Sequence, residues 1–348
     1  MKLLILTQKI DINDDVLGFF HRWVLEFAKN CEKVTVICLQ KGEYDLPENV
    51  KVLSLGKENN VSKFKYLINF YKYIWQERKS YDAVFVHMNP EYVVLGGLFW
   101  KVLGKKISLW YTHKSVNLKL RIAEKITDEI FTVAKESFRL KSKKINVMGH
   151  GIDIKCFICD KENEHSEIVR ILHIGRITKI KNCDILIRTA KILKDKWNKD
   201  FMISFVGSPS NKEDQQYLKS LKEMIIDMDL KQNIEFLGSI PNKDIKSYYC
   251  SADITINLAP TGGIDKVVLE SMASETLVFA SNTAFKDYFG SYADMLLFNE
   301  GDQDDLANKV MRVYEKGRKE EIKEFLFKEV DSKSNIENLI DKILNKLN

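Results

Sequence analysis

Short apolar runs alternate with longer amphipathic stretches along almost the whole chain. In the first half, apolar runs predict strands at residues 2–7, 34–39, 50–53, 83–87, 107–111, 129–133 and 145–148. Between them, apolar residues recur every three or four positions and predict helices, for example over residues 19–29, 63–78 and 91–103. The second half continues with strands predicted near residues 169–174, 201–206, 233–237, 253–257 and 276–280. This alternation predicts an α/β fold with parallel sheets covered by helices on both faces.

The length of the chain and one polar stretch divide this pattern into two domains. A chain of 348 residues is too long for one ordinary core. Residues 155–168 are polar and lose the periodicity, so we expect a linker between a first domain, residues 1–154, and a second, residues 169–332. Residues 333–348 predict a C-terminal helix, because one apolar stripe at helical spacing runs through them: Ile336, Leu339, Ile340, Ile343, Leu344 and Leu347.

The composition describes a soluble globular protein, with 45% hydrophobic and 30% charged residues. The longest apolar stretch, residues 92–100, is too short to cross a bilayer. The six cysteines are scattered, which favours reduced thiols and a cytoplasmic location. Cys156 and Cys159 have the spacing of half a zinc site, but no second such pair exists. We interpret them as ordinary linker cysteines and expect no metal.

The formal net charge of +5 is unevenly distributed. Residues 101–150 contain 12 basic and 4 acidic side chains, which indicates an anionic partner for the first domain. No nucleic-acid-binding motif is present, so we expect an anionic lipid surface rather than nucleic acid.

Two basic segments of the first domain carry this expectation. Residues 63–79 mix aromatic residues with bases, as an interfacial helix does. A second segment adds the bases Lys135, Arg139, Lys141, Lys143 and Lys144. The alternative is that the aromatic residues pack on the sheet and the bases form a solvated face. Docking would place the protein peripherally on the inner face of the cell membrane.

A pair of cations lies where a predicted strand passes into a helix. The apolar run at residues 171–174 ends in Gly175 and Arg176, and Lys181 follows where a helical pattern begins. A helix N-terminus attracts anions, and Arg and Lys both bind phosphate oxygens. The spacing therefore indicates a diphosphate site, or else two surface cations in a loop.

A second stretch, residues 253–280, predicts a strand, a glycine turn, a helix and another strand. Gly262 and Gly263 form the turn, and glycines allow a ligand to approach the backbone closely. Glu270 follows inside the predicted helix.

These pieces together resemble the retaining GT-B glycosyltransferases of glycosyltransferase family 4 (glycosyl transferases group 1). The similar segments are Gly175-Arg176 with Lys181, Gly207 after the strand at 203–206, the run 234–241, the stretch 248–253 and the run 268–273. Their order and spacing fit over roughly residues 168–290. The first half fits more loosely, through residues 146–157 and Tyr111-Thr-His113.

The resemblance implies a fold of two Rossmann-like, doubly wound domains facing across a cleft. The second domain would bind a nucleotide-sugar and the first would bind the acceptor. The C-terminal helix would cross back onto the first domain, although it could also pack on its own domain.

The resemblance also implies roles for individual residues. Arg176 and Lys181 would stabilise the leaving diphosphate in place of a metal, and Glu270 would accept hydrogen bonds from the ribose hydroxyls. His113 would line the reaction centre. The nucleotide-sugar site would comprise Gly175, Gly207, Gly238, Ile240, Gly262, Gly263, Ile264, Asp265, Lys266 and Glu270.

Two positions depart from the family pattern. The first Glu of the Glu-x₇-Glu motif is replaced by Gly262, and we expect Asp265 or Lys266 to take over some of the sugar contacts. The glycine-rich loop after the first strand is reduced to Gly18, which would approach the phosphate or the acceptor.

The resulting prediction is a metal-independent, retaining glycosyltransferase of the hexosyltransferase type (EC 2.4). It would move a sugar from a nucleotide diphosphate donor to a glycan or lipid-linked acceptor, with no cofactor. The alternatives are a non-catalytic glycosyltransferase-like binding subunit and a GT-B nucleotide-sugar epimerase.

Overall fold

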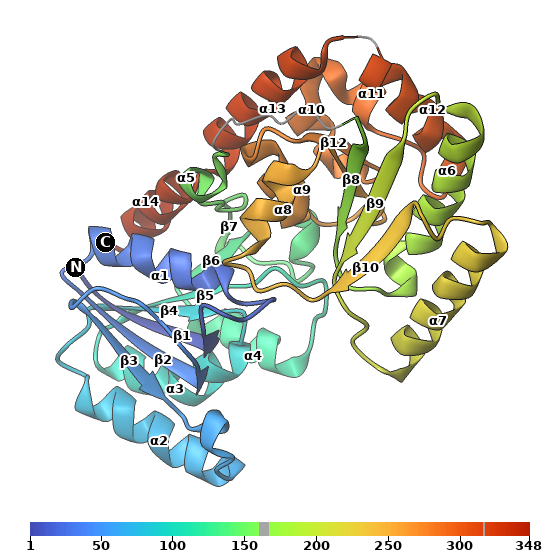
Figure 1. Ribbon diagram of the computed structural model, residues 1–348. Coiled ribbons are helices and arrows are strands. Elements are labelled where there is room, and N and C mark those ends of the chain that lie inside the picture. Colours follow the sequence, from blue (N-terminus) through green and yellow to red (C-terminus); the bar gives the residue numbers. More distant parts are fainter. Residues whose placement is uncertain (160–166, 316) are drawn as a thin grey trace. The chain divides into compact units, whose positions relative to one another are not determined.

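The computed structural model describes residues 1–159, 167–315 and 317–348 (Figure 1). Contacts within the chain divide it into two units. Unit 1 comprises Met1–Gly151, Pro241–Lys243 and Ile336–Asn348, and unit 2 comprises Ile152–Ile240 and Asp244–Asn335. The segment expected to be a linker begins inside a helix, because α5 (Ile154–Phe157) includes its first residues. Residues 160–166 of that segment lie outside the described residues.

Unit 1 is built on a parallel sheet of seven strands in the order β3-β2-β1-β4-β5-β6-β7. The strands are β1 (Lys2–Ile10), β2 (Lys33–Lys41), β3 (Val50–Ser54), β4 (Ala83–His87), β5 (Lys106–Trp110), β6 (Glu129–Thr132) and β7 (Ile145–Val147). The chain starts in the middle of the sheet, moves to one edge, and then crosses back to β4. This reversal is the arrangement of a doubly wound fold.

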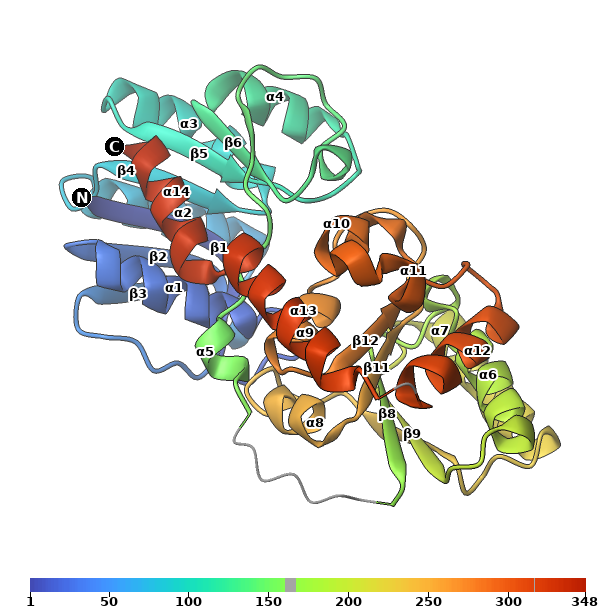
Figure 2. The same ribbon diagram turned by 90° about the horizontal axis from the view of Figure 1, so that it is seen from above.

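Helices cover both faces of this sheet (Figures 1 and 2). One face carries α1 (Phe19–Asn30) and α14 (Ile336–Leu347). The other carries α2 (Lys63–Gln76), α3 (Pro90–Val102) and α4 (Leu118–Ile126), which share one buried cluster with strand residues such as Leu4 and Val84. Right-handed crossovers put these three helices on the same face, because each connection moves across the sheet in the same direction.

Unit 2 contains a smaller parallel sheet of five strands in the order β10-β9-β8-β11-β12. The strands are β8 (Val169–Ile174), β9 (Phe201–Val206), β10 (Ile234–Gly238), β11 (Ile254–Asn257) and β12 (Leu277–Ala280). The strand order reverses between β8 and β11, and ligands bind at the carboxyl ends of strands at such a point.

Helices separate the consecutive strands of unit 2, and further helices follow β12. After α5 they are α6 (Cys183–Lys196), α7 (Lys212–Asp227), α8 (Ile245–Ser251), α9 (Lys266–Ala273), α10 (Lys286–Phe289), α11 (Ala293–Leu296), α12 (Gln303–Glu315) and α13 (Lys319–Ser334). A short 3₁₀ turn, Lys179–Lys181, precedes α6. Buried residues from both sheet faces and from α6, α9, α12 and α13 form one continuous core.

The predicted α/β class with parallel sheets is confirmed. The predicted strands at 83–87, 169–174 and 201–206 coincide with β4, β8 and β9. The C-terminal apolar stripe forms α14, and all six of its predicted apolar residues are buried within unit 1.

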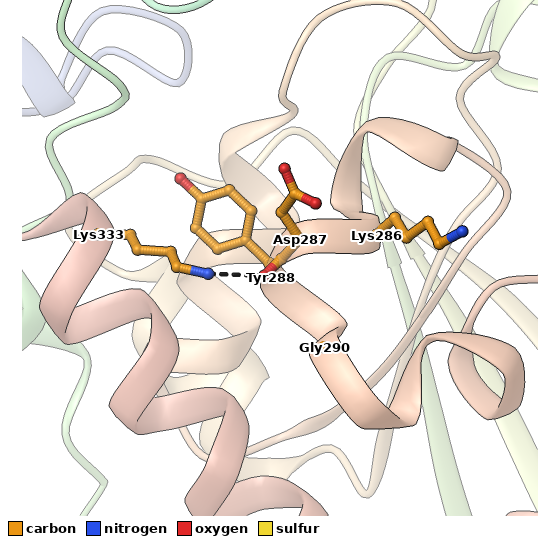
Figure 3. Close-up of a pocket in the computed structure, with 5 residues that line it drawn as sticks. All are labelled: Lys286, Asp287, Tyr288, Gly290 and Lys333. Atoms are coloured by element: carbon orange, nitrogen blue, oxygen red, sulfur yellow. Dashed lines mark hydrogen bonds between the residues drawn. The ribbon is translucent and has the colours of Figure 1, made fainter.

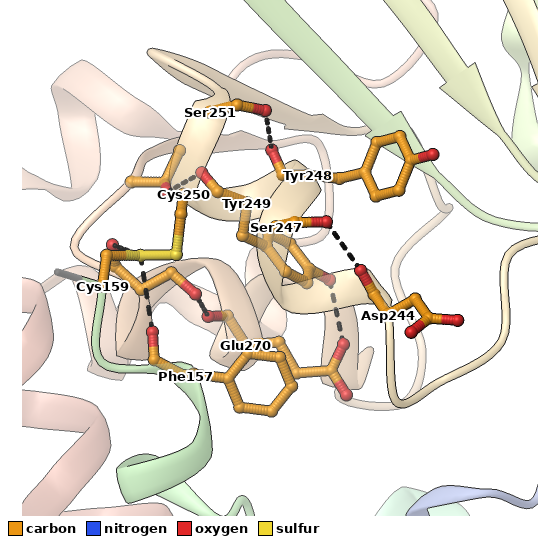
Figure 4. The surroundings of a disulfide bond; sticks show 11 residues. Phe157, Cys159, Asp244, Ser247, Tyr248, Tyr249, Cys250, Ser251 and Glu270 are labelled. Carbon is orange, nitrogen blue, oxygen red and sulfur yellow. Dashed lines mark hydrogen bonds between the residues drawn. A yellow bond between two sulfur atoms is a disulfide. The ribbon is translucent and has the colours of Figure 1, made fainter. Parts of the chain in front are cut away.

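The structure corrects the expectation of reduced thiols for two of the six cysteines. Cys159, just after α5, and Cys250 in α8 form a disulfide with their Cα atoms 5.5 Å apart (Figure 4). The two residues are 91 positions apart in sequence, so tertiary folding rather than local spacing brings them together. Cys156 instead donates its thiol to Asp153 Oδ2 at 2.9 Å. The two cysteines expected to be ordinary linker residues thus differ: Cys159 forms a disulfide, and Cys156 forms a hydrogen bond.

Candidate functional site

Glycines shape the carboxyl edge of the sheet in unit 2. Gly175 follows β8, Gly207 follows β9, and Gly238 ends β10. A Cβ atom on Gly207 would lie 1.9 Å from the carbonyl oxygen of Gly175, and the φ of Gly207 is 140°. Backbone hydrogen bonds join Gly207 N–H to Gly238 O (2.8 Å) and Gly175 N–H to Val206 O (2.9 Å). These three predicted site residues thus share one edge of the sheet. We call it the glycine edge (Gly175, Gly207 and Gly238). No side chain there separates the backbone of these residues from a ligand.

An ion pair joins the two segments that carry the predicted motifs. Lys181 Nζ lies 2.7 Å from Asp265 Oδ2, although 84 residues separate them. Asn257, buried at the end of β11, donates its side-chain amide to the same oxygen at 3.1 Å. Asp265 directly precedes α9, so its carboxylate holds the Lys181 ammonium beside the N-terminus of that helix. The junction lies where the strand order reverses, at the ends of β8 and β11.

Arg176 differs from Lys181 in its surroundings. It is exposed in the turn after Gly175 and forms no ion pair with the described part of the chain. The side chain of Lys181 is only 20% exposed. One cation of the predicted clamp is therefore held in an ion pair, and the other lies exposed at the surface.

Glu270 is buried in α9 rather than exposed on the surface of the helix. It is 6% exposed, and the Tyr249 hydroxyl donates to its Oε2 at 2.9 Å (Figure 4). Burial, together with the neighbouring Glu270 carboxylate, holds the pKa of Tyr249 well above its usual range. Tyr249 therefore stays protonated and fixes the orientation of the Glu270 carboxylate.

Tyr249 is itself positioned by the disulfide. Its neighbour in sequence, Cys250, is bonded to Cys159 (Figure 4). Tyr249 is fully buried in α8 and packs edge-on against Phe157 at 5.8 Å between ring centres. The cross-link thus anchors the helix that supports Glu270.

Lys266 is the first residue of α9 and lies in sequence between the two carboxylates Asp265 and Glu270. Removal of its ammonium from water lowers the pKa of Lys266 to about 8, and the charges of Glu270 and Asp265 oppose that shift. Part of the residue remains exposed. The Lys266 ammonium therefore loses its proton more readily than an ordinary lysine does.

The turn before α9 contains Gly262, Gly263 and Ile264 and is hydrogen-bonded to the segment just after β12. The side-chain amide of Asn282 donates to the Gly263 carbonyl at 2.7 Å. Position 262 has no side chain, so a carboxylate is missing where the family motif has one. Ile240, two residues after β10, is half-buried and packs against the core of unit 2.

Sequence reasoning missed His173 in β8. It is 1% exposed, its Nδ1 lies 2.9 Å from the Ile256 carbonyl, and burial lowers its pKa to about 4. The ring is thus neutral at pH 7, and the carbonyl keeps the proton on Nδ1. One signal could have revealed it, since a polar residue interrupts the apolar run Ile171–Ile174. Its hydrogen bond to Ile256 joins β8 to β11 near their carboxyl ends.

Two predicted residues, His113 and Gly18, belong to unit 1. His113 is exposed shortly after the carboxyl end of β5, and its Nδ1 accepts a hydrogen bond from the Ser115 backbone at 3.1 Å. In the neutral ring, that bond leaves the proton on Nε2 as a donor.

Gly18 precedes α1 with an ordinary helical φ of −54°. A Cβ at this position would lie 2.4 Å from the Asp14 carbonyl oxygen and 3.0 Å from Asn242 Cβ. Close packing, rather than an unusual backbone angle, therefore explains the glycine.

Other features of the described residues do not mark a second reaction centre. No three His, Cys, Asp or Glu side chains gather closely enough there to hold a metal ion. An open pocket of about 660 Å³ is lined by Lys286, Asp287, Tyr288, Gly290 and Lys333 (Figure 3). Lys333 donates to the Asp287 carbonyl at 2.6 Å. None of the predicted site residues lines this pocket.

Comparison with known proteins points to one class. Residues 155–325 match the family model described as "Glycosyl transferases group 1". The match spans the glycine edge, the Lys181–Asp265 ion pair and Glu270. The match covers just under half of the chain.

Two curated relatives share part of this similarity. The O-antigen chain mannosyltransferase RfbU of Salmonella typhimurium is 27% identical over 147 residues, covering 42% of this chain and 38% of RfbU. The amylovoran biosynthesis glycosyltransferase AmsK of Erwinia amylovora is 28% identical over 179 residues, covering 49% of this chain and 42% of AmsK. The similarity thus spans about two fifths of the length of each relative.

The whole chain is similar in fold to a solved structure. HepE from Anabaena in complex with UDP superimposes with a TM-score of 0.77 at 16% identity, over 100% of this chain and 99% of that chain. A structure of HepE with UDP-glucose gives a TM-score of 0.75. At this identity the likeness concerns the fold, and it confirms the predicted GT-B class of two Rossmann-like α/β domains.

Proposed function

We propose that the protein is a metal-independent, retaining glycosyltransferase of family 4 that moves a hexose from a nucleotide diphosphate sugar to a glycan or lipid-linked acceptor. One observation carries the proposal: the ion pair of Lys181 with Asp265 joins the two predicted motif segments at the strand-order reversal. Buried Glu270 belongs to α9, the helix that begins directly after Asp265. Both segments fall within the region that matches the glycosyltransferase family model.

The residues divide the reaction between them. The anomeric C–O bond to the diphosphate breaks, and the acceptor hydroxyl oxygen forms the new bond to the same carbon. Arg176 and Lys181 neutralise the negative charge that develops on the leaving nucleoside diphosphate. The acceptor proton leaves with the diphosphate. His113 Nε2–H donates a hydrogen bond near the reacting carbon.

Glu270 binds the nucleotide rather than reacting. The Glu270 carboxylate accepts hydrogen bonds from two ribose hydroxyls. The hydrogen bond from the Tyr249 hydroxyl fixes the orientation of this carboxylate. The glycine edge lets the diphosphate approach backbone N–H groups at the ends of β8 and β9. A hexose nucleotide as the donor is supported by two similar proteins, since RfbU is named a mannosyltransferase and HepE was solved with UDP-glucose.

A titration and a turnover assay test the proposal together. Calorimetric titration with UDP, GDP and ADP identifies the nucleotide, and the matching sugar nucleotides are then incubated with candidate glycan and lipid-linked acceptors. We expect release of nucleoside diphosphate that depends on the acceptor, with an unchanged anomeric configuration in the product. Turnover that requires added Mg²⁺ or Mn²⁺, or inversion at the anomeric carbon, would contradict the mechanism.

Gly262 favours one alternative, a non-catalytic binding subunit. A missing carboxylate at this position removes a partner for the donor sugar, while the nucleotide contacts remain. Such a subunit would bind the nucleotide tightly but release no diphosphate with any acceptor. An epimerase would convert the donor sugar without an acceptor, so the same assay separates all three functions.

A further inference from the structure

Helix α2 has apolar side chains on two different faces. One face is buried on the sheet, where Phe70 and Ile74 are each 1% exposed. A second face of the helix is exposed, with exposed fractions of 70, 44, 44 and 57% for Phe64, Ile68, Tyr71 and Trp75. Steps of four, three and four residues place these four side chains on one stripe of the helix. A helix that packs on a sheet needs only one apolar stripe, so the second indicates another contact.

The neighbouring helix α3 continues this surface. Leu95, Leu98 and Val102 are 38, 73 and 87% exposed. The Tyr71 hydroxyl donates to the Leu95 carbonyl at 3.1 Å, and Trp75 packs on Phe99 at 6.0 Å between ring centres. We call this surface the α2–α3 apolar face, made of Phe64, Ile68, Tyr71, Trp75, Leu95, Leu98 and Val102.

The concentration of apolar side chains here is unusual for the molecule. Among the described residues, 17 large hydrophobic side chains are exposed, and seven of them form the α2–α3 apolar face. Two more, Leu118 and Ile122, lie on α4, which packs beside α3. Isolated exposed apolar residues are normal on soluble proteins, but a continuous group marks an interaction surface.

Basic residues accompany the face. Lys63, Lys65 and Lys72 are exposed on α2, and α2 contains no acidic residue. On α4, Arg121 and Lys125 are also exposed. The other basic segment, residues 135–144, adds charge but no large exposed apolar side chain, so it cannot form an insertion surface by itself.

We propose that the α2–α3 apolar face docks unit 1 onto an anionic lipid bilayer surface. Its aromatic and aliphatic side chains lie at the boundary of the acyl chains, and the lysines lie among anionic headgroups. The positive charge selects this occupant over a neutral partner surface. No helix in the described ranges is long and apolar enough to cross a membrane, so the contact is an interfacial one. This docking is independent of the donor site in unit 2.

Trp75 supplies a built-in reporter. It is 57% exposed, whereas Trp23, Trp100, Trp110 and Trp197 are at most 6% exposed. With phosphatidylglycerol vesicles at low salt, the tryptophan emission should shift to shorter wavelength and be quenched by brominated acyl chains. Trp75→Phe should abolish both signals while vesicle co-sedimentation persists. Phosphatidylcholine vesicles, or added salt, should weaken both.

Paired substitutions separate insertion from charge. Phe64→Ser with Leu98→Ser should lower vesicle partitioning about tenfold or more, because each removes a buried apolar side chain. Lys65→Gln with Lys72→Gln should lower it about 25-fold at low salt. The matched controls lie on α7, where Ile226→Ser removes a side chain that is 55% exposed and Lys219→Gln with Lys222→Gln removes two bases. These controls should leave partitioning unchanged.

Three results would overturn the proposal. The first is no emission shift with anionic vesicles at low salt. The second is partitioning that survives the Phe64 and Leu98 substitutions. The third is a dimer, seen by sedimentation velocity without vesicles, that the same substitutions dissociate; this would assign the face to a second copy of the chain. The assays use neither donor nor acceptor, so they stand apart from the test of transferase activity.

Discussion

The two sheets end differently, although both units have parallel, doubly wound sheets. In unit 2, glycines lie at the carboxyl ends of β8, β9 and β10, and the backbone itself forms the edge. In unit 1, the end of β1 and the loop after it carry side chains instead: Lys9 pairs with Asp11 at 3.1 Å and Asp14 at 2.6 Å. The carboxyl ends of three strands in unit 2 are thus bare backbone, whereas in unit 1 charged side chains follow β1 directly.

The lysines at the two edges give the sharpest test of this contrast. Lys181→Ala should cost about 2–4 kcal/mol of transition-state stabilisation, a roughly 30- to 1,000-fold loss in kcat/KM. Lys9→Ala is the matched control, a lysine paired with aspartates at the edge of unit 1. It should lower kcat/KM by less than about fivefold. Equal losses in steady-state assays of donor consumption would remove the functional distinction between the edges.

The glycines test whether the two edges need glycine for different reasons. Gly207→Ala places a Cβ 1.9 Å from a backbone oxygen at a φ of 140°, so it should lower the free energy of unfolding by about 2–4 kcal/mol. At Gly18 the φ is accessible to alanine, and the new Cβ is opposed only by closely packed neighbours. Gly18→Ala should therefore lower the free energy of unfolding by about 1–2 kcal/mol. Urea unfolding measures both. A smaller loss for Gly207→Ala than for Gly18→Ala would show that the edge of unit 2 relaxes.

Glu270 tests whether nucleotide binding resides in unit 2. Glu270→Gln keeps an acceptor for Tyr249 but loses the charge, and should weaken binding of the nucleoside diphosphate by about 1–3 kcal/mol. Glu223→Gln, at an exposed position of α7, is the control and should bind normally. Titration calorimetry reports the difference. Wild-type affinity in Glu270→Gln would reduce this residue to a structural partner of Tyr249.

His113 is the corresponding test for unit 1. Loss of one hydrogen-bond donor in His113→Ala should lower kcat by roughly 5- to 30-fold, about 1–2 kcal/mol. The nucleotide Kd should stay at the wild-type value, because the nucleotide contacts belong to unit 2. The reverse result, a weaker Kd with normal kcat, would move His113 from the acceptor side to the donor side.

Lys266 gives the smallest expected effect, on stability as a function of pH. Its pKa of about 8 in the folded protein lies below the ordinary value of 10.5. Between these two values the unfolded chain binds more protons than the native state, so stability should rise with pH from 8 to 10.5. The gain should stay below about 1 kcal/mol, since the residue is partly exposed. Lys266→Met should flatten this rise in thermal unfolding, and Lys219→Met on α7 should not.

Most of the fold was predictable because strand and helix periods are local properties of the sequence. Residues 169–174 and 201–206 are apolar runs bounded by polar residues, and the predicted bounds are those of β8 and β9 in the structure. The sequence also indicates a candidate anion site at residues 175–181, since this segment combines a strand end, a glycine and two cations. The sequence predicts sugar contacts for Asp265 or Lys266 but gives no sign of the ion pair between Asp265 and Lys181, which only the fold brings together.

Three features escaped prediction because they depend on distant parts of the chain. The disulfide joins Cys159 to a residue 91 positions away. His173 has a role only because β11 brings the Ile256 carbonyl to its ring. The exposed stripe of α2 could not be separated from its buried stripe by periodicity, since both are apolar. Only the packed sheet decides that Phe70 faces inward and Trp75 outward.

The disulfide between Cys159 and Cys250 also makes part of unit 2 a covalent ring. The ring contains β8, β9 and β10 together with α6 and α7, and so includes the glycine edge and Lys181. Closing a ring of about 90 residues restricts the unfolded chain by roughly 4–5 kcal/mol in the chain-entropy description. A single backbone cut anywhere inside it would leave one linked molecule, and the two fragments would separate only after a reductant is added.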